Sequence, residues 1–185
     1  MINQIYERIK LEFQAEKLVM GEGEINSKIL LIGEAPGAQE VKEGRPFVGK
    51  AGENLNEFIT YLGITREDIY ITNVVKYRST KLSPKTQKPI NRTPKKNEIE
   101  SFKSFLLDEI VEINPQIIVT LGNIPLQALF GYSEKIGSCH GKYNCIKIAG
   151  YEFKVFSLYH PAAIIYNNSL KEVYLDDLDK LKENL

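Results

Sequence analysis

The fold is decided by residues 28–37, KILLIGEAPG, where a short apolar run passes directly into a turn-rich segment. Four consecutive aliphatic residues bounded by turn signals are typical of a strand buried on both faces of a sheet. Gly33, Pro36 and Gly37 end this strand and begin a loop. Open α/β sheets bind their ligands beyond the ends of such strands, so this loop is the first candidate for a functional site.

Other segments extend the pattern outward from this strand. Residues 69–75 and 116–121 predict two further buried strands, and residues 143–148 and 151–158 predict a hairpin that turns at Ala149-Gly150. Helices are predicted over 2–18, 51–62 and 124–130, from Thr93-Pro94 as N-cap and first residue to about Ile113, and between 170 and 185.

Alternating strands and helices predict an α/β fold, a three-layer α/β/α sandwich with a mostly parallel central sheet. We expect residues 1–185 to form one domain, because 185 residues with 43% hydrophobic content are ordinary for a globular domain. The carboxyl ends of parallel strands lie at one edge of a sheet. We therefore expect the loops 33–37, 73–78, 122–123 and 159–161 to meet there.

The composition argues against several classes of protein. The sequence has no run of 18 apolar residues, and its N-terminal MINQIYERIKLEF is too charged for the hydrophobic region of a signal peptide, so we expect no membrane partner. Cys139 and Cys145 lack the paired spacing of a zinc or iron–sulfur site, which favours free thiols in the cytoplasm and no metal. The phosphate-binding patterns G-x-x-x-x-G-K-[ST] and G-x-G-x-x-G are absent, which argues against nucleoside triphosphate hydrolysis.

A basic segment is hidden within a formal net charge of zero, because residues 76–96 contain no acid. Its basic residues are Lys76, Arg78, Lys81, Lys85, Lys88, Arg92, Lys95 and Lys96. The segment predicts either a surface that contacts phosphates or a solvated loop whose lysines keep the protein soluble. Within it, residues 79–93 are predicted to be one long loop.

The loop from Gly33 to Gly52 is richer in glycine and proline than a plain connector requires. It carries two carboxylates near the proposed ligand edge, Glu34 and Glu40, and an aromatic ring, Phe47, between Pro46 and Val48. The ring is a candidate for stacking on a base. The alternative is that Phe47 packs in the core and that the glutamates cap helices or are solvated.

Blocks in order between residues 29 and 165 resemble the family 4 uracil-DNA glycosylases: GEAPG-x-x-E, GRPFVG-x-AG, NVVK, NR-x-P and HPA. The resemblance implies a monofunctional DNA repair glycosylase that flips uracil into a pocket at the strand ends and hydrolyses its N-glycosidic bond. The same superfamily includes a domain related to phage DNA polymerases. A noncatalytic DNA-binding module of this fold and a glycosylase for another deaminated base remain alternatives.

The resemblance also assigns roles to residues. Asn73 would read uracil O4 and N3–H, Phe47 would stack under the ring, and His160 would donate a hydrogen bond to O2 as negative charge builds there. Glu34 and Glu40 match the two acids that support the sugar and the attacking water, and which of them dominates is left open. The other matched positions of the substrate loop are Gly33, Ala35 and Pro36.

The resemblance bears on cofactors and partners as well. Most family 4 members hold a [4Fe–4S] cluster through four cysteines, two before the first strand, one at the position of Tyr77 and one near Ser101-Phe102. None of these positions is cysteine here, so we expect neither this cluster nor another cofactor. The expected partner is uracil-containing DNA, bound by a monomer. The predicted DNA contacts are Lys76, Arg78, Lys81, Lys85, Lys88 and Arg92, with Ile164 and Tyr166 in an apolar wedge over residues 162–166.

Overall fold

The computed structural model describes residues 1–167 and 169–185, without the side chains of residues 165 and 166. Its main sheet contains β1 (Ile29–Gly33), β2 (Ile69–Asn73), β5 (Ile117–Leu121), β6 (Tyr143–Ile148) and β7 (Tyr151–Leu158). The strand order is β2-β1-β5-β7-β6, and only β6 runs antiparallel to its neighbour. The predicted buried strands and the predicted hairpin of β6 and β7 are confirmed.

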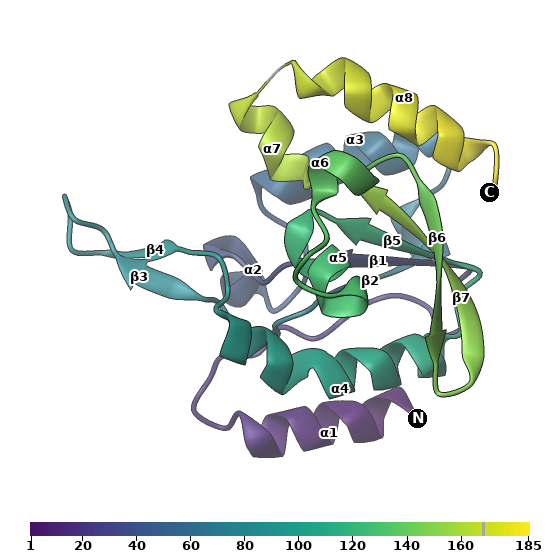
Figure 1. Cartoon of the computed structure of the whole chain (residues 1–185). Coiled ribbons are helices and arrows are strands. Elements are labelled where there is room, and N and C mark those ends of the chain that lie inside the picture. Colours follow the sequence, from purple (N-terminus) through teal and green to yellow (C-terminus); the bar gives the residue numbers. More distant parts are fainter. Residues whose placement is uncertain (168) are drawn as a thin grey trace.

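Helices cover both faces of this sheet (Figure 1). One face carries α1 (Ile2–Glu12), α4 (Lys96–Ile113) and α5 (Asn123–Phe130), and the other carries α3 (Lys50–Leu62), α7 (Pro161–Tyr166) and α8 (Leu170–Lys182). The short elements are α2 (Ala38–Glu43), a 3-10 turn at Arg66–Asp68 and α6 (Ile136–Cys139). The predicted α/β/α sandwich is therefore confirmed. None of the helices in the described residues is long and apolar enough to cross a membrane.

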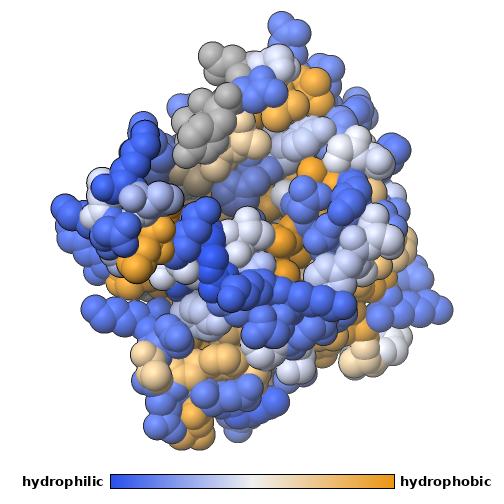
Figure 2. Space-filling view, turned by 60° about the vertical axis from the view of Figure 1, so that its left-hand side comes forward, coloured by the Kyte–Doolittle hydropathy of each residue, from blue (hydrophilic) through white to orange (hydrophobic). Residues whose placement is uncertain are grey.

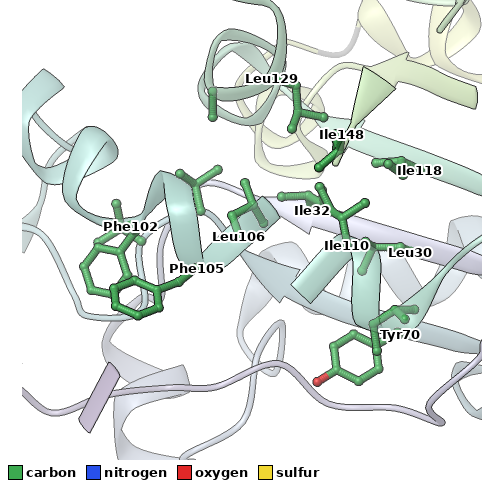
Figure 3. Close-up of a cluster of buried hydrophobic side chains, with 14 of the residues drawn as sticks. Leu30, Ile32, Tyr70, Phe102, Phe105, Leu106, Ile110, Ile118, Leu129 and Ile148 are labelled. Carbon is green, nitrogen blue, oxygen red and sulfur yellow. The ribbon is translucent and has the colours of Figure 1, made fainter. Parts of the chain in front are cut away.

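The core divides into two layers because successive residues of a strand point to opposite faces of the sheet. From β1, Leu30 and Ile32 pack toward α4, where they meet Leu106 and Ile110 (Figure 3). Leu31 points the other way, toward α3 and α8. Every residue of β1, β2 and β5 is buried, so these strands are held firmly in the core and their carboxyl ends are fixed in position.

The basic segment folds differently from the prediction of one long loop. Residues 79–93 contain a β-hairpin formed by β3 (Thr80–Leu82) and β4 (Pro89–Asn91), which projects from the body of the protein (Figure 1). The following helix also begins later than predicted, with Lys95 rather than Thr93 as its N-cap, because the Glu98 carboxylate accepts the Lys95 N–H. The first helix is shorter than predicted and ends at Glu12.

Candidate active site

A pocket of about 420 Å³ opens at the carboxyl ends of the central strands. Three of the loops predicted to meet there line it, and the fourth passes directly beside it, since a side chain added at Gly122 would lie 3.1 Å from His160 Cβ. Residues lining the pocket are Ala35, Gly37, Ala38, Gln39, Glu40, Phe47, Gly49, Lys50, Ala51, Asn73, Asn91, His160 and Ala162. Among the described residues, Gly33, Glu34 and Pro36 lie outside this lining.

Asn73 and Phe47 are brought together by a glycine. Gly33 and Asn73 are partners in the register of β1 and β2, and a Cβ at Gly33 would clash with Asn73 Oδ1 and lie 2.5 Å from the Phe47 ring. Asn73 is only 3% exposed, and no described residue hydrogen-bonds its side-chain amide. Its carbonyl and NH2 group are therefore available to a ligand in the pocket.

Phe47 is both a packed ring and a pocket wall. It is 5% exposed and has a φ of 53°, a left-handed conformation that is unusual for an aromatic residue. The guanidinium of Arg66 donates to the Phe47 carbonyl at 3.0 Å, which holds the strained segment in place. Phe47 is thus packed in the core, as the alternative interpretation stated, and its ring also lines the pocket.

His160 lies at the N-terminus of α7 with its tautomer fixed by the backbone. Its Nδ1 accepts the Ala162 N–H at 3.1 Å, so the proton of the neutral ring is on Nε2. Burial lowers the pKa of His160 to about 4, although the negative charge of Glu40 opposes this shift. At neutral pH the residue is an uncharged imidazole that offers one N–H.

The Glu40 carboxylate holds the two ends of the loop together. One oxygen accepts the Gly37 N–H at 3.0 Å, and the other accepts the N–H groups of Val48 at 3.1 Å and Gly49 at 2.8 Å. The helix-capping alternative describes these contacts well. Glu40 borders the pocket, but three backbone amides occupy its oxygens.

Glu34 has a different environment from Glu40. Burial raises the pKa of Glu34 to about 7, with a partly compensating hydrogen bond from the Thr93 side chain. Its main-chain carbonyl accepts the Val75 N–H at 3.1 Å, which ties the first loop to the segment after β2. Its carboxyl group can therefore exchange a proton near neutral pH.

Lys76 does not contact solvent, and its prediction as a DNA contact is wrong. The side chain is 0% exposed and its ammonium forms an ion pair with Glu109 from α4. It also donates to Thr72 Oγ1 and to the Asn73 carbonyl, each at 2.7 Å. Burial lowers the pKa of Lys76 and Glu109 opposes the shift. Lys76 supports the turn that carries Asn73.

The two predicted arginines brace the hairpin at its base. Arg92 forms a bidentate pair with Glu98, at 2.6 and 2.9 Å, so its charge is already partnered. Arg78 donates to Asn91 Oδ1 at 2.7 Å and to the Pro89 carbonyl at 3.4 Å. Neither partner is a carboxylate, and Arg78 forms no ion pair with any residue that the structure describes, so its charge can meet a phosphate.

The hairpin lysines are all exposed, as a phosphate-contacting surface requires. They are Lys81, Lys85 and Lys88. Figure 2 brings the hairpin side of the molecule forward and shows mostly hydrophilic side chains there, with hydrophobic ones between them.

The predicted wedge over residues 162–166 is wrong at Ile164. This side chain is 8% exposed and belongs to the core beneath α3 and α8. The side chain of Tyr166, the other predicted wedge residue, lies outside the described part of the structure.

Asn91 is one of the pocket residues that were not predicted as site residues from the sequence. It reaches the pocket from β4, and its Nδ2 would lie 3.3 Å from a Cβ added at Gly37. The NR-x-P block contained this residue, but the hairpin that positions it was expected to be a loop. The hydrogen bond from Arg78 to its Oδ1 fixes the amide.

The region that would hold the [4Fe–4S] cluster of the resemblance contains aromatic side chains. Phe13 stacks on Phe102 with ring centroids 4.1 Å apart, and Tyr77 packs edge-on against Phe102 at 5.6 Å. The Tyr77 hydroxyl donates to Glu98 at 2.8 Å. None of these side chains offers the thiolate through which proteins bind an iron–sulfur cluster. Across the described residues, no cluster of three or more His, Cys, Asp or Glu side chains could hold a metal ion.

Comparison with known proteins gives concordant matches. A model of the uracil DNA glycosylase superfamily matches residues 20–181. A type-4 uracil-DNA glycosylase of Saccharolobus solfataricus is 41% identical over 184 residues, which cover 97% of this chain and 81% of that protein. The type-4 enzyme of Thermotoga maritima is 38% identical over 96% of this chain and 91% of its own length. A DNA polymerase of Bacillus phage SP01 is 30% identical over 89% of this chain but only 16% of the polymerase.

Proposed function

The chain belongs to the uracil DNA glycosylase superfamily, and we propose that it is a repair glycosylase that hydrolyses the N-glycosidic bond of uracil in DNA. The observation that carries this proposal is that the Asn73 amide and a neutral His160 imidazole line the same pocket. A flipped uracil needs both a reader for its edge and a donor for the charge that it acquires.

Uracil recognition follows from the chemistry of the Asn73 amide. Its NH2 group donates to uracil O4 and its carbonyl accepts from N3–H. Cytosine presents the reverse pattern at these two positions, so both groups of the amide would face a like partner. The Phe47 ring supplies a stacking surface in the same pocket, worth about 1 to 3 kcal/mol for a base.

Bond cleavage places the electron pair of the C1′–N1 bond on uracil. The Nε2–H of His160 donates to O2 as the base leaves as an anion, which favours the transition state over the bound substrate. Water adds to C1′ and must lose a proton. We assign that proton to Glu34, which directly precedes the pocket residue Ala35 in the chain. No backbone amide of the described residues donates to its carboxyl, and its pKa of about 7 suits proton exchange. Glu40 would position the loop.

DNA binding and cofactor use complete the proposal. The exposed lysines Lys81, Lys85 and Lys88, with Arg78 beside them, would contact phosphates, and the partner is uracil-containing DNA. The enzyme would work as a monomer in the cytoplasm, where its free Cys139 and Cys145 stay reduced. Because the cluster positions hold aromatic residues, we further propose that it needs neither iron nor another cofactor.

Excision of uracil from single-stranded and U:G oligonucleotides in the presence of EDTA tests this proposal. We expect an abasic product, which His160→Ala lowers by about 100- to 1,000-fold and Asn73→Ala also lowers strongly. His140→Gln is the matched control, since His140 pairs with Asp177 outside the pocket lining and should keep full activity. The iron content of the purified enzyme is measured in parallel.

The outcomes separate the candidate functions. A folded protein that binds DNA but yields no abasic product at enzyme excess would be the noncatalytic module. Product formed from another deaminated base but not from uracil would reassign the substrate. Activity that disappears with EDTA, or stoichiometric iron in the active protein, would overturn the cofactor-free interpretation.

A further inference from the structure

The hairpin of β3 and β4 has two chemically different faces. Residues opposite one another in an antiparallel pair share a face, and successive residues alternate between faces. The face that reaches the pocket comprises Thr80, Leu82, Pro89 and Asn91. Lys81 and Ile90 pair on the other face. The pocket wall therefore continues outward along the first face into an apolar pair.

Leu82 is placed just beyond the pocket and is open to solvent. It is 61% exposed, and it lies one pair farther along this face than the Thr80–Asn91 pair. At about 3.3 Å per residue, that step is roughly 7 Å. When a nucleotide is flipped into the pocket, the bases next to it in the DNA stack would lie within about this distance and could contact Leu82.

The base of the hairpin is held rigidly. The buried carboxylate of Glu98 accepts from Arg92, from the Tyr77 hydroxyl and from the Lys95 N–H. Arg92 also donates from Nε to the Thr80 carbonyl at 2.9 Å. This network fixes both strands to the start of α4.

The tip of the hairpin is closed by its own hydrogen bonds. The Ser83 N–H donates to the Lys88 carbonyl and the Gln87 N–H donates to the Ser83 carbonyl, each at 2.9 Å. A braced base and a closed tip make the hairpin a pre-organised arm rather than a solvated loop, so little conformational entropy opposes its binding to a partner.

We propose that the hairpin is a DNA-inserting arm in which Leu82, backed by Pro89, contacts the bases beside the nucleotide flipped into the pocket. This inference rests on the proposed function. The partner of the hairpin is duplex DNA. The hairpin carries Lys81, Lys85 and Lys88 and no acid, and its apolar face continues the pocket wall. Ile164 cannot supply such a contact, since it is buried in the core.

The arm acts on duplex substrates. Flipping a base out of a duplex requires unpairing and unstacking, and an apolar side chain inserted at the vacated step stabilises the opened state. A single strand has no pairing to break. The contribution of Leu82 is therefore expected on paired uracil and not on unpaired uracil.

Single-turnover excision by Leu82→Ser, with Ile90→Ser as the matched control on the opposite face, tests the arm. We expect Leu82→Ser to lower the rate on U:G and U:A duplexes by at least about tenfold and to leave the rate on single strands unchanged. Ile90→Ser should leave both rates unchanged. Equal losses on both substrates, equal losses in both variants, or full duplex activity in Leu82→Ser would each overturn the proposal.

A second measurement keeps the test independent of catalysis. The fluorescence of 2-aminopurine placed beside the uracil in a duplex rises when that base unstacks. We expect the unmodified protein and Ile90→Ser to raise this fluorescence on binding, and Leu82→Ser to raise it much less. If the protein excises no uracil at all, the proposed function fails while this signal still decides for or against the arm.

Discussion

Lys76 and Lys85 belong to the same basic segment, but the structure gives them opposite environments. Lys76 is wholly buried, paired with Glu109 and bonded to the Asn73 carbonyl, whereas Lys85 is exposed near the tip of the hairpin. The buried pair stabilises the turn after β2, and the exposed residue is free to meet phosphate. Basic character along a segment therefore does not define a surface, because the fold divides the segment between the core and an arm.

The largest expected effect comes from breaking the buried pair. Lys76→Met should lower the free energy of unfolding by about 3 to 5 kcal/mol, because Glu109 would remain as an unpaired charge in the core. Urea denaturation measures this change. Lys85→Met is the matched control and should stay within about 0.5 kcal/mol of the original protein.

A second variant separates charge burial from weakened packing. Replacing both partners, in Lys76→Met with Glu109→Leu, should recover much of the lost stability, because no uncompensated charge remains. If Lys76→Met proved as harmless as Lys85→Met, the contrast between the buried and the exposed half of the segment would fail.

This contrast also explains what the sequence could predict. The strands and the pocket loops were predictable because their signals are local: aliphatic runs, glycines and prolines fix where β1 ends. The partner of Lys76 lies on another element, at Glu109, so no local pattern announces the pair. The two residues before it, Val74 and Val75, are apolar, and both are fully buried in the structure. This apolar context was the sequence signal that Lys76 could lie in the core.

The hairpin was missed for another reason. Its strands are three residues each, they carry lysine and proline, and their residues are exposed, so they lack the alternation that marks a half-buried strand. The tip contains no Asn-Gly or Asp-Gly turn. Tertiary contacts of Arg92 and Glu98 hold the arm, and Asn91 reaches the pocket only as a result of them.

The next largest effect is expected at the pocket, which the buried half of the segment supports through Asn73. Gly33→Ala places a methyl group against Asn73 Oδ1 and 2.5 Å from the Phe47 ring. We expect a loss of about 1 to 3 kcal/mol in unfolding free energy, as for other overpacked sites. Displacement of either side chain should also lower kcat/KM by about 100-fold.

Gly137→Ala is the matched control for this prediction. Gly137 is exposed, and the nearest atom to an added Cβ is the Tyr159 hydroxyl at 3.9 Å. Urea denaturation and single-turnover excision should show both quantities unchanged there. Normal kcat/KM in Gly33→Ala would show that the pocket tolerates movement of its reader and its stacking ring.

A smaller effect is expected from pH, through Glu34. Burial raises the pKa of Glu34 from 4.5 to about 7, so between these values the folded protein binds more protons at this site than the unfolded chain. The contribution of Glu34 to stability therefore falls as pH rises through this window, by at most about 1.4 kcal/mol per pH unit. Glu34→Gln should remove this slope in urea denaturation measured at several pH values.

The same titration should govern activity in the opposite direction. If ionised Glu34 accepts the proton of water, the excision rate rises with pH through about 7 in the original protein and loses this rise in Glu34→Gln. A rate profile that is identical in both proteins would remove Glu34 from the proton transfer.

The smallest effect on stability, and the one that defines the exposed half of the comparison, comes from the hairpin lysines. Replacing Lys81, Lys85 and Lys88 together by glutamine should change the unfolding free energy by less than about 0.5 kcal/mol, since all three are exposed. DNA affinity should respond instead, because each lysine that neutralises a phosphate releases a counterion. The slope of log K against log salt, followed by fluorescence anisotropy between about 50 and 200 mM salt, should become shallower by about 0.9 for each phosphate that is no longer neutralised.

Lys28, Lys147 and Lys154 provide the matched triple variant, because they are also exposed but lie away from the pocket, with Lys28 and Lys154 beside the amino ends of β1 and β5. Replacing them by glutamine removes the same total charge from the protein. Long-range attraction alone would flatten the slope equally in both triple variants, whereas direct contacts flatten it only when the hairpin is changed. Equal slopes would therefore show that Lys85 is exposed but does not contact DNA. The basic segment would then have a core half, but its other half would not be a DNA-binding surface.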